Sequence, residues 1–256
     1  MDLGLTGRVA MVAASSSGLG LAVAKALAAE GATLSICGRD PDKLAKAHVE
    51  VNAMGEADVL SIPVDLRDEQ AAACWVDRTA NHFGGIDILV TNTGGVPFGP
   101  VDAFGVADYR AAIDGNLLPH ISLTLAALPI IREGGWGRVI MMASESVRQP
   151  HPESGLSSVA RLGLLGYMKG LVHALGASGV TVNVLAPGFH RTPILDVQFG
   201  DDVEAELARV AERIPLGRVG NAADFGALAA FLASDQASYV TGTVLLADGG
   251  NTRGIS

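Results

Sequence analysis

The sequence predicts a single α/β domain in which a parallel sheet of seven strands carries helices on both faces. Short apolar runs alternate with segments of helical spacing through all 256 residues, and no linker, repeat or low-complexity stretch divides them. Because crossover connections are right-handed, this alternation leads to a doubly wound sheet. The length suffices for one large domain with a substantial core. We expect the ligand crevice at the carboxyl ends of the strands.

The first strand, turn and helix organise the rest of the chain. Residues 8–14 are apolar, as in a strand buried on both faces. A turn rich in hydroxyl groups and glycine follows at 15–20, and the helical spacing after it ends at Gly31. The amide groups at the helix N-terminus favour an anion, and Gly18 and Gly20 allow a pyrophosphate to approach the backbone. The alternative is that this turn is an ordinary strand-to-helix connection. The position of the turn after the first strand of the series favours a nucleotide site.

The remaining elements follow the same pattern. Six further strands are expected at 33–37, 59–64, 86–90, 138–143, 180–186 and 243–246. Helices are expected from about 41 to 54, 68 to 83, 101 to 132 with a break near Pro119, 154 to 177, 203 to 213 and 222 to 232. The segments 96–102 and 197–202 read as loops that border a substrate pocket.

Composition excludes several classes of partner. The formal net charge is −9 with no basic block, which argues against nucleic acid or an anionic membrane surface. No apolar stretch is long enough to span a membrane, and the start lacks the basic region of a signal peptide. Cys37 and Cys74 do not form a metal-type pair, so we expect no metal site and a cytoplasmic location.

The turn after the first strand resembles the Thr-Gly-x-x-x-Gly-x-Gly signature of the short-chain dehydrogenase/reductase family. Gly18 and Gly20 match it, while Ala13 and Ala14 stand in place of Thr and Gly. The change at Ala14 is mild if its φ is negative. The resemblance extends over about residues 5–250 and is nearest to the branch similar to 3-oxoacyl-carrier-protein reductases. It implies one Rossmann-type domain over residues 1–256.

The resemblance also assigns the cofactor site. Arg39 follows Gly38 after the second strand, where an enzyme specific for NAD places an acid, so NADP(H) is favoured over NAD(H). A solvated Arg39 paired with Asp40 or Asp42 is the alternative. The predicted cofactor-binding residues are Ser15, Ser17, Gly18, Leu19, Gly20, Arg39, Asp65, Leu66, Asn92, Gly94, Arg161, Pro187, Gly188, Phe189 and Thr192.

The family's chemistry uses an Asn, a Ser, a Tyr and a Lys. Asn116 and Ser144 match the first two, whereas Ser157 and Arg161 occupy the positions of Tyr and Lys. Their i, i+4 spacing places both on one helix face. An arginine does not release its proton, but it can bind ribose hydroxyls and stabilise an oxyanion. An ion pair with a nearby glutamate is the alternative role for Arg161.

A serine hydroxyl is a much weaker acid than a tyrosine, and no tyrosine replaces the missing one. Tyr167 lies six residues beyond Arg161, on roughly the opposite side of the helix. Other candidate proton donors are Glu145, His151 and Glu153 in the preceding loop. His190 is a further candidate, beside the Pro187-Gly188 segment whose backbone the resemblance places at the nicotinamide. The remaining histidines are expected at the surface or in packing: His48, His82, His120 and His173.

We therefore predict an NAD(P)-dependent oxidoreductase that reduces a small carbonyl or oxidises an alcohol, with water, a loop residue or the substrate as the acid. The alternatives are a regulatory nucleotide-binding protein without hydride transfer, and a dehydratase or isomerase on the same scaffold. Asn116 and Ser144 favour an enzyme, since an inert protein needs neither. The resemblance implies a homo-oligomer, a dimer or tetramer, formed through the helices that carry Asn116 and Ser157.

Overall fold

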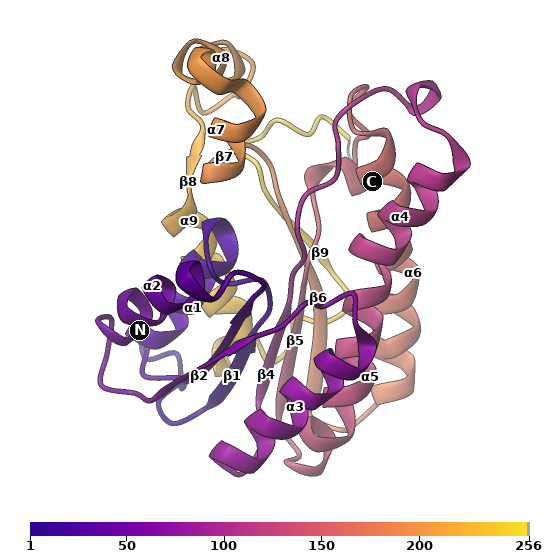
Figure 1. Ribbon diagram of the computed structural model, residues 1–256. Coiled ribbons are helices and arrows are strands. Elements are labelled where there is room, and N and C mark those ends of the chain that lie inside the picture. The colour runs from indigo at the N-terminus through magenta and orange to yellow at the C-terminus, as the bar shows by residue number, and fades with distance from the viewer. Residues whose placement is uncertain (255–256) are drawn as a thin grey trace.

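The computed structural model describes residues 1–254, apart from the side chain of Gln198, and contains a central parallel sheet (Figure 1). The strand order is β3-β2-β1-β4-β5-β6-β9, and each neighbouring pair is parallel. The seven predicted strands are therefore confirmed. Their bounds are β1 Val9–Val12, β2 Thr33–Gly38, β3 Val59–Pro63, β4 Ile88–Thr91, β5 Gly137–Met142, β6 Val180–Pro187 and β9 Val244–Ala247.

Helices cover both faces of the sheet, as a doubly wound fold requires (Figure 1). One face carries α3 (Glu69–Phe83), α5 (Leu118–Glu133) and α6 (Gly155–Leu175); the other carries α1 (Gly18–Ala29), α2 (Pro41–Asn52) and α9 (Ala222–Ala233). The helix α4 (Val106–Asn116) packs against α6. Within residues 1–254, no helix is long and apolar enough to cross a membrane.

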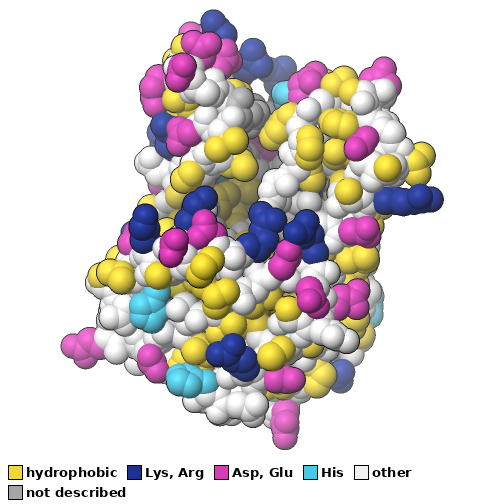
Figure 2. Space-filling view, in the orientation of Figure 1, with side chains coloured by type: hydrophobic (Ala, Val, Ile, Leu, Met, Phe, Trp, Pro, Cys, Tyr) yellow, Lys and Arg dark blue, Asp and Glu magenta, His cyan; other side chains and the backbone are white. Residues whose placement is uncertain are grey.

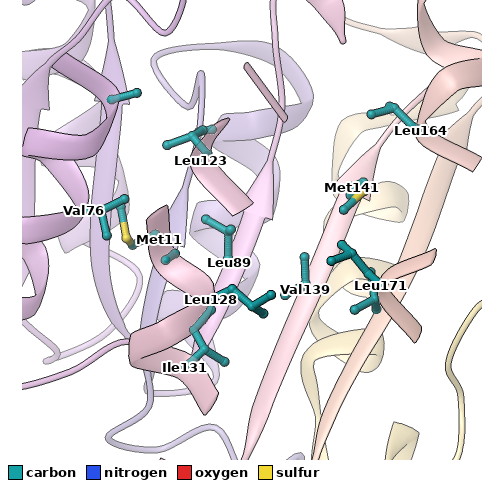
Figure 3. Close-up of a cluster of buried hydrophobic side chains, with 14 of the residues drawn as sticks. Met11, Val76, Leu89, Leu123, Leu128, Ile131, Val139, Met141, Leu164 and Leu171 are labelled. Atoms are coloured by element: carbon teal, nitrogen blue, oxygen red, sulfur yellow. The ribbon is translucent and has the colours of Figure 1, made fainter. Parts of the chain in front are cut away.

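Two apolar clusters hold these layers together. Figure 3 shows part of the first, in which Met11, Leu89 and Val139 of the strands meet Leu123 of α5 and Leu171 of α6. The second cluster lies between the opposite face and α1, α2 and α9. Since both faces are covered, apolar residues point to both sides of the strands, and this is why the runs in the sequence do not alternate strictly.

The structure corrects several predicted boundaries. The helical region predicted at 101–132 breaks at Leu117, and Pro119 lies in the first turn of α5, where its missing N–H costs no hydrogen bond. The helix α1 begins at Gly18, not near residue 21. Residues 197–202 are not a loop: they belong to α7 (Pro193–Phe199) and a following 3-10 turn, η3 (Gly200–Asp202).

A small lobe lies above the sheet, and of its elements only the helix at 203–213 was predicted. It contains α7, the helix α8 (Val203–Ala211), and a two-stranded parallel sheet of β7 (His190–Arg191) and β8 (Gly220–Asn221). Strands of two residues carry no detectable periodicity, so the sequence reading missed them.

Ala14, in the turn after β1, has a left-handed backbone with φ +47°. The condition under which Ala could replace the family's glycine at little cost is therefore not met, because a side chain is unfavourable in this region by about 1–2 kcal/mol. Nearby, a β-carbon on Gly20 would lie 2.4 Å from the carbonyl oxygen of Ala14. The turn thus keeps the tight geometry of a glycine-rich loop, with strain stored at Ala14.

Candidate active site

A cleft of about 660 Å³ opens at the carboxyl ends of the strands, where the doubly wound topology predicts it. Figure 2 shows it as a hollow between the lobe of α7 and α8 and the part of the molecule that carries α4. Every predicted cofactor-binding residue except Ser15 lines this cleft, and so do all four predicted catalytic residues. Residues brought together from many loops therefore form one site.

The start of α1 lies at the end of the cleft where the sequence predicts the phosphate groups, which we call the phosphate end. Gly18 has φ +59° and begins the helix after the extended Ser17, so the first amide groups of α1 lack helical partners. Thr192 lies opposite, with its side chain 3.7 Å from the position of a β-carbon on Gly18. Ser15 does not line the cleft: its hydroxyl donates to the carbonyl oxygen of Val12 at 2.7 Å. A buried hydroxyl takes its nearest backbone partner, and this orientation could not be read from the sequence.

The end of the cleft that is predicted to hold the adenosine, which we call the adenosine end, contains two arginines. Arg39 lines the cleft, and within residues 1–254 no carboxylate lies within ion-pairing distance of it. Asp40 instead caps α2 by accepting hydrogen bonds from the amides of Asp42 and Lys43. Asp65 is bound by Arg67, whose hydrogen bond is the main cause that lowers the pKa of the Asp65 carboxyl to about 2. Arg67 was not predicted, since neither the spacing of the motifs nor the family resemblance pointed to it.

The loop after β4 connects the two halves of the cleft. Asn92 donates to the carbonyl oxygen of Ala14 at 3.4 Å and so ties this loop to the phosphate turn. The carbonyl oxygen of Gly94 accepts a hydrogen bond from Arg161 at 3.3 Å. The segment from Pro187 through Phe189 closes the far side of the cleft.

Arg161 is the buried cation of the catalytic end. Arg161 is only 9% exposed, and its Nη1 donates a hydrogen bond to the hydroxyl of Ser157 at 3.0 Å. Burial lowers the pKa of Arg161 to about 10, which still leaves it charged at neutral pH. Among the described side chains no carboxylate pairs with it, so the alternative of an ion pair with Glu145 or Glu153 is not observed. Its Nε is buried and unpartnered.

Thr91, the last residue of β4, and Thr93, in the loop after it, each hold a polar residue of the neighbouring helices. The Thr93 hydroxyl donates to Oδ1 of Asn116 at 3.0 Å, which fixes the amide in the cleft. Thr91 shares a 2.7 Å hydrogen bond with Nδ1 of His120, which is fully buried. Burial, together with the charge of Arg161, lowers the pKa of His120 to about 3. His120 is therefore a buried packing residue, as expected, and it also makes a polar contact with Thr91.

The other candidate proton donors lie at different depths. His151 and Glu153 are exposed at the rim of the cleft, while Glu145 and His190 are buried in its lining. Tyr167 does not line the cleft, as its position on α6 predicted.

The residues present fit a bound dinucleotide. The phosphate turn is a backbone cradle in which β-carbons are missing at the points of approach, and the unpartnered Nε of Arg161 is a buried donor beside the predicted ribose position. Fold and cleft together define a dinucleotide-binding protein of the Rossmann class.

Comparison with known proteins specifies the family. Residues 13–252 match the family described as enoyl-(acyl carrier protein) reductase. The chain is 31% identical to D-beta-hydroxybutyrate dehydrogenase of Rhizobium meliloti (strain 1021), covering 96% of this chain and 98% of the relative. It is 30% identical to 2-dehydro-3-deoxy-L-rhamnonate dehydrogenase (NAD(+)) of Sphingomonas sp. (strain SKA58), covering 96% of each.

The fold comparison agrees. L-sorbose reductase from Gluconobacter frateurii, solved with NADPH and L-sorbose, superposes with a TM-score of 0.93 at 28% identity over 100% of both chains. The chain belongs to the short-chain dehydrogenase/reductase family of NAD(P)-dependent oxidoreductases.

Proposed function

We propose that the protein is an NADP(H)-preferring oxidoreductase that interconverts a small carbonyl and its alcohol. The observation that carries this proposal is the unpaired, buried charge of Arg161 beside the hydroxyl groups of the catalytic end. A buried cation without a counter-ion is costly unless a ligand supplies electron-rich atoms. Ribose hydroxyls and a developing alkoxide are groups of that kind.

Each residue of the catalytic end has a separate role in the proposal. Ser144 accepts a hydrogen bond from the amide of Ser146 at 3.3 Å, so its own proton is free to donate to a carbonyl oxygen in the cleft. Arg161 binds the ribose next to the nicotinamide and stabilises negative charge on that oxygen. Asn116, held by Thr93, keeps the shape of this end. A bound nicotinamide supplies the hydride chemistry.

The preference for NADP(H) rests on Arg39. Its guanidinium lines the adenosine end without a carboxylate partner among residues 1–254, and it suits a 2′-phosphate. The relatives divide on this point, since the sorbose reductase was solved with NADPH and the rhamnonate dehydrogenase is named for NAD(+). For this chain, Arg39 alone supports a preference for NADP(H).

The test is a hydride-transfer assay on a defined panel. D-beta-hydroxybutyrate is supplied with NADP+ or NAD+, and L-sorbose with NADPH or NADH, and the nicotinamide absorbance is followed. We expect turnover of at least one compound and a loss of about 10²-fold in Ser144→Ala, because one oxyanion donor is removed, with NADPH affinity unchanged. Tight NADPH binding without turnover in the wild type would instead support the regulatory alternative.

The homo-oligomeric state and the cytoplasmic location remain predictions. Exposed apolar side chains on α4, α5 and α6 support an interface there: Val106, Leu118, Leu125, Val159 and Leu162. Light scattering of the purified chain checks this expectation, and a monomer at micromolar concentration would contradict it.

A further inference from the structure

The catalytic end of the cleft lacks an obvious acid, because Ser157 is weakly acidic and Arg161 does not release its proton. Three of the candidate proton donors near this end are poorly suited to that role. His151 and Glu153 are exposed at the rim of the cleft. His190 is hydrogen-bonded through Nδ1 to the carbonyl oxygen of Gly188 at 3.1 Å, and this contact holds the backbone at Gly188. Glu145 remains.

Glu145 lies next to Ser144 in the chain, at the start of the 3-10 turn η2 (Glu145–Val147). It lines the cleft yet is only 9% exposed, which is rare for a glutamate without a cationic partner. Its Oε2 lies 2.9 Å from the position that a β-carbon on Gly188 would occupy. The carboxyl group is therefore seated against the Pro-Gly segment that the family resemblance assigns to the nicotinamide.

Residues distant in the sequence hold this carboxyl group. Nδ2 of Asn251 donates to both of its oxygens, at 3.2 and 3.1 Å. Asp248, after β9, lies against the same face of Gly188 and accepts hydrogen bonds from the amides of Gly250 and Thr252. Asp248 is thus fully supplied with donors, whereas Glu145 has a single amide.

The pKa values of the two carboxyl groups are shifted in opposite directions. Burial raises the pKa of Glu145, and the charge of Asp248 adds to this effect against the opposing hydrogen bond from Asn251. Burial also acts on Asp248, but the hydrogen bonds from Thr252 and Gly250 outweigh it and lower the pKa of that group. Two neighbouring carboxyl groups whose pKa values are shifted in opposite directions are the arrangement typical of an acid and its neighbour in an active site.

We propose that Glu145 is the proton donor of the catalytic end, and the base in the reverse direction; this inference rests on the proposed function. In the reduction, the carbonyl carbon receives the hydride that the reduced nicotinamide supplies. The carbonyl oxygen takes the proton of Glu145 as the O–H bond of the carboxyl group breaks. The carbonyl is reduced to an alcohol, the nicotinamide is oxidised, and the carboxylate recovers a proton from solvent.

The first test uses the cofactor alone. The oxidised nicotinamide ring is cationic, so NADP+ binding should lower the pKa of Glu145 and release up to about one proton at a pH between its two values. We compare proton release by calorimetry in buffers of different ionisation enthalpy, from about pH 5 to 8. The wild type should release more protons than Glu145→Gln, which keeps the side-chain size and the contact with Asn251.

Other titrating groups contribute equally to both proteins. These are Asp248, His190, Arg161 and the cofactor's own 2′-phosphate. Glu153→Gln, at the exposed rim, is the matched control and should release as many protons as the wild type. Asn251→Ala removes the one donor to the carboxyl group, so it should move the proton-release window to higher pH. Equal release by the wild type and Glu145→Gln at every pH would overturn the assignment.

The second test is kinetic and uses whichever alcohol or ketone of the panel is turned over fastest. Glu145→Gln should lower kcat by about 10²- to 10⁴-fold and remove one limb of its pH profile, with NADPH affinity retained. A pH limb that persists in the variant overturns the proposal. If the wild type turns over no panel compound, the proposed function fails. The calorimetric comparison still shows whether Glu145 releases a proton when NADP+ binds.

Discussion

The guanidinium of Arg161 donates to the hydroxyl of Ser157 one helical turn earlier, with Nη1 and Oγ 3.0 Å apart. The same guanidinium reaches the carbonyl oxygen of Gly94 across the cleft. The pair that stands in place of the family's Tyr and Lys is thus a connected unit. A charge is retained at this position, while the more acidic hydroxyl of a tyrosine is not.

The two members of this unit should respond differently to substitution. Arg161→Met removes the charged donor, so NADPH binding should weaken by roughly 1.5–3 kcal/mol, at least about tenfold. Ser157→Ala removes a neutral hydroxyl and should cost about 0.5–1.5 kcal/mol, or about tenfold at most. Fluorescence titration and steady-state kinetics measure both. Loss of all turnover in Ser157→Ala, with intact binding, would make Ser157 the essential proton carrier.

Arg161→Met also has a readout without cofactor. Removing a buried cation that has no counter-ion should leave the free energy of unfolding of the free protein unchanged or raised. A strongly destabilised variant would show that Arg161 is a structural residue.

Arg39 should set the cofactor preference. A charge-assisted contact with the 2′-phosphate contributes roughly 1.5–3 kcal/mol, so NADPH should bind about tenfold or more tightly than NADH. In Arg39→Ala the two affinities should approach each other. Arg67→Ala is the comparison, since Arg67 is already bound to Asp65 and should affect the preference less. Equal affinities in the wild type would refute the role of Arg39.

Ala14→Gly should stabilise the protein. The substitution relieves about 1–2 kcal/mol of left-handed strain, against about 0.5–1 kcal/mol of added backbone entropy in the unfolded chain, for a net gain of up to about 1.5 kcal/mol. Ala13→Gly is the matched control: Ala13 is buried with an ordinary negative φ, so it should lose stability. Urea unfolding measures both, and a destabilised Ala14→Gly would show that the turn tolerates alanine without strain.

His120 should make stability depend on pH. Its folded pKa of about 3 lies below its ordinary value of about 6.5, so between these values the unfolded chain binds more protons. The free energy of unfolding should therefore fall as the pH drops below about 6.5, by up to about 1.4 kcal/mol per pH unit from this group.

The control for this effect is His173, which is exposed on α6. His120→Gln should flatten the pH dependence of urea unfolding between about pH 6.5 and 4.5, whereas His173→Gln should leave it unchanged. Equal slopes for the wild type and His120→Gln would mean that His120 titrates normally in the folded protein.

Local patterns in the sequence determined the order of the elements and the general place of the site. Apolar runs without alternation require coverage on both faces, and alternation of strand and helix leaves few topologies. The i, i+4 spacing of Ser157 and Arg161 made their contact on one helix face predictable. The same reasoning placed the glycine turn at a helix N-terminus.

The contacts among the polar groups of the site depend on the tertiary structure and could not be predicted from the sequence. The left-handed φ of Ala14 and the inward turn of Ser15 depend on packing between the loops after β1, β2 and β4. The hydrogen bonds from Asn251 to Glu145 join residues 106 positions apart, and that of Thr91 with His120 spans 29. Periodicity reports only which face of an element is buried. Which polar group meets another inside the protein is decided when the whole chain is packed, since most buried polar groups find their hydrogen-bond partners only then.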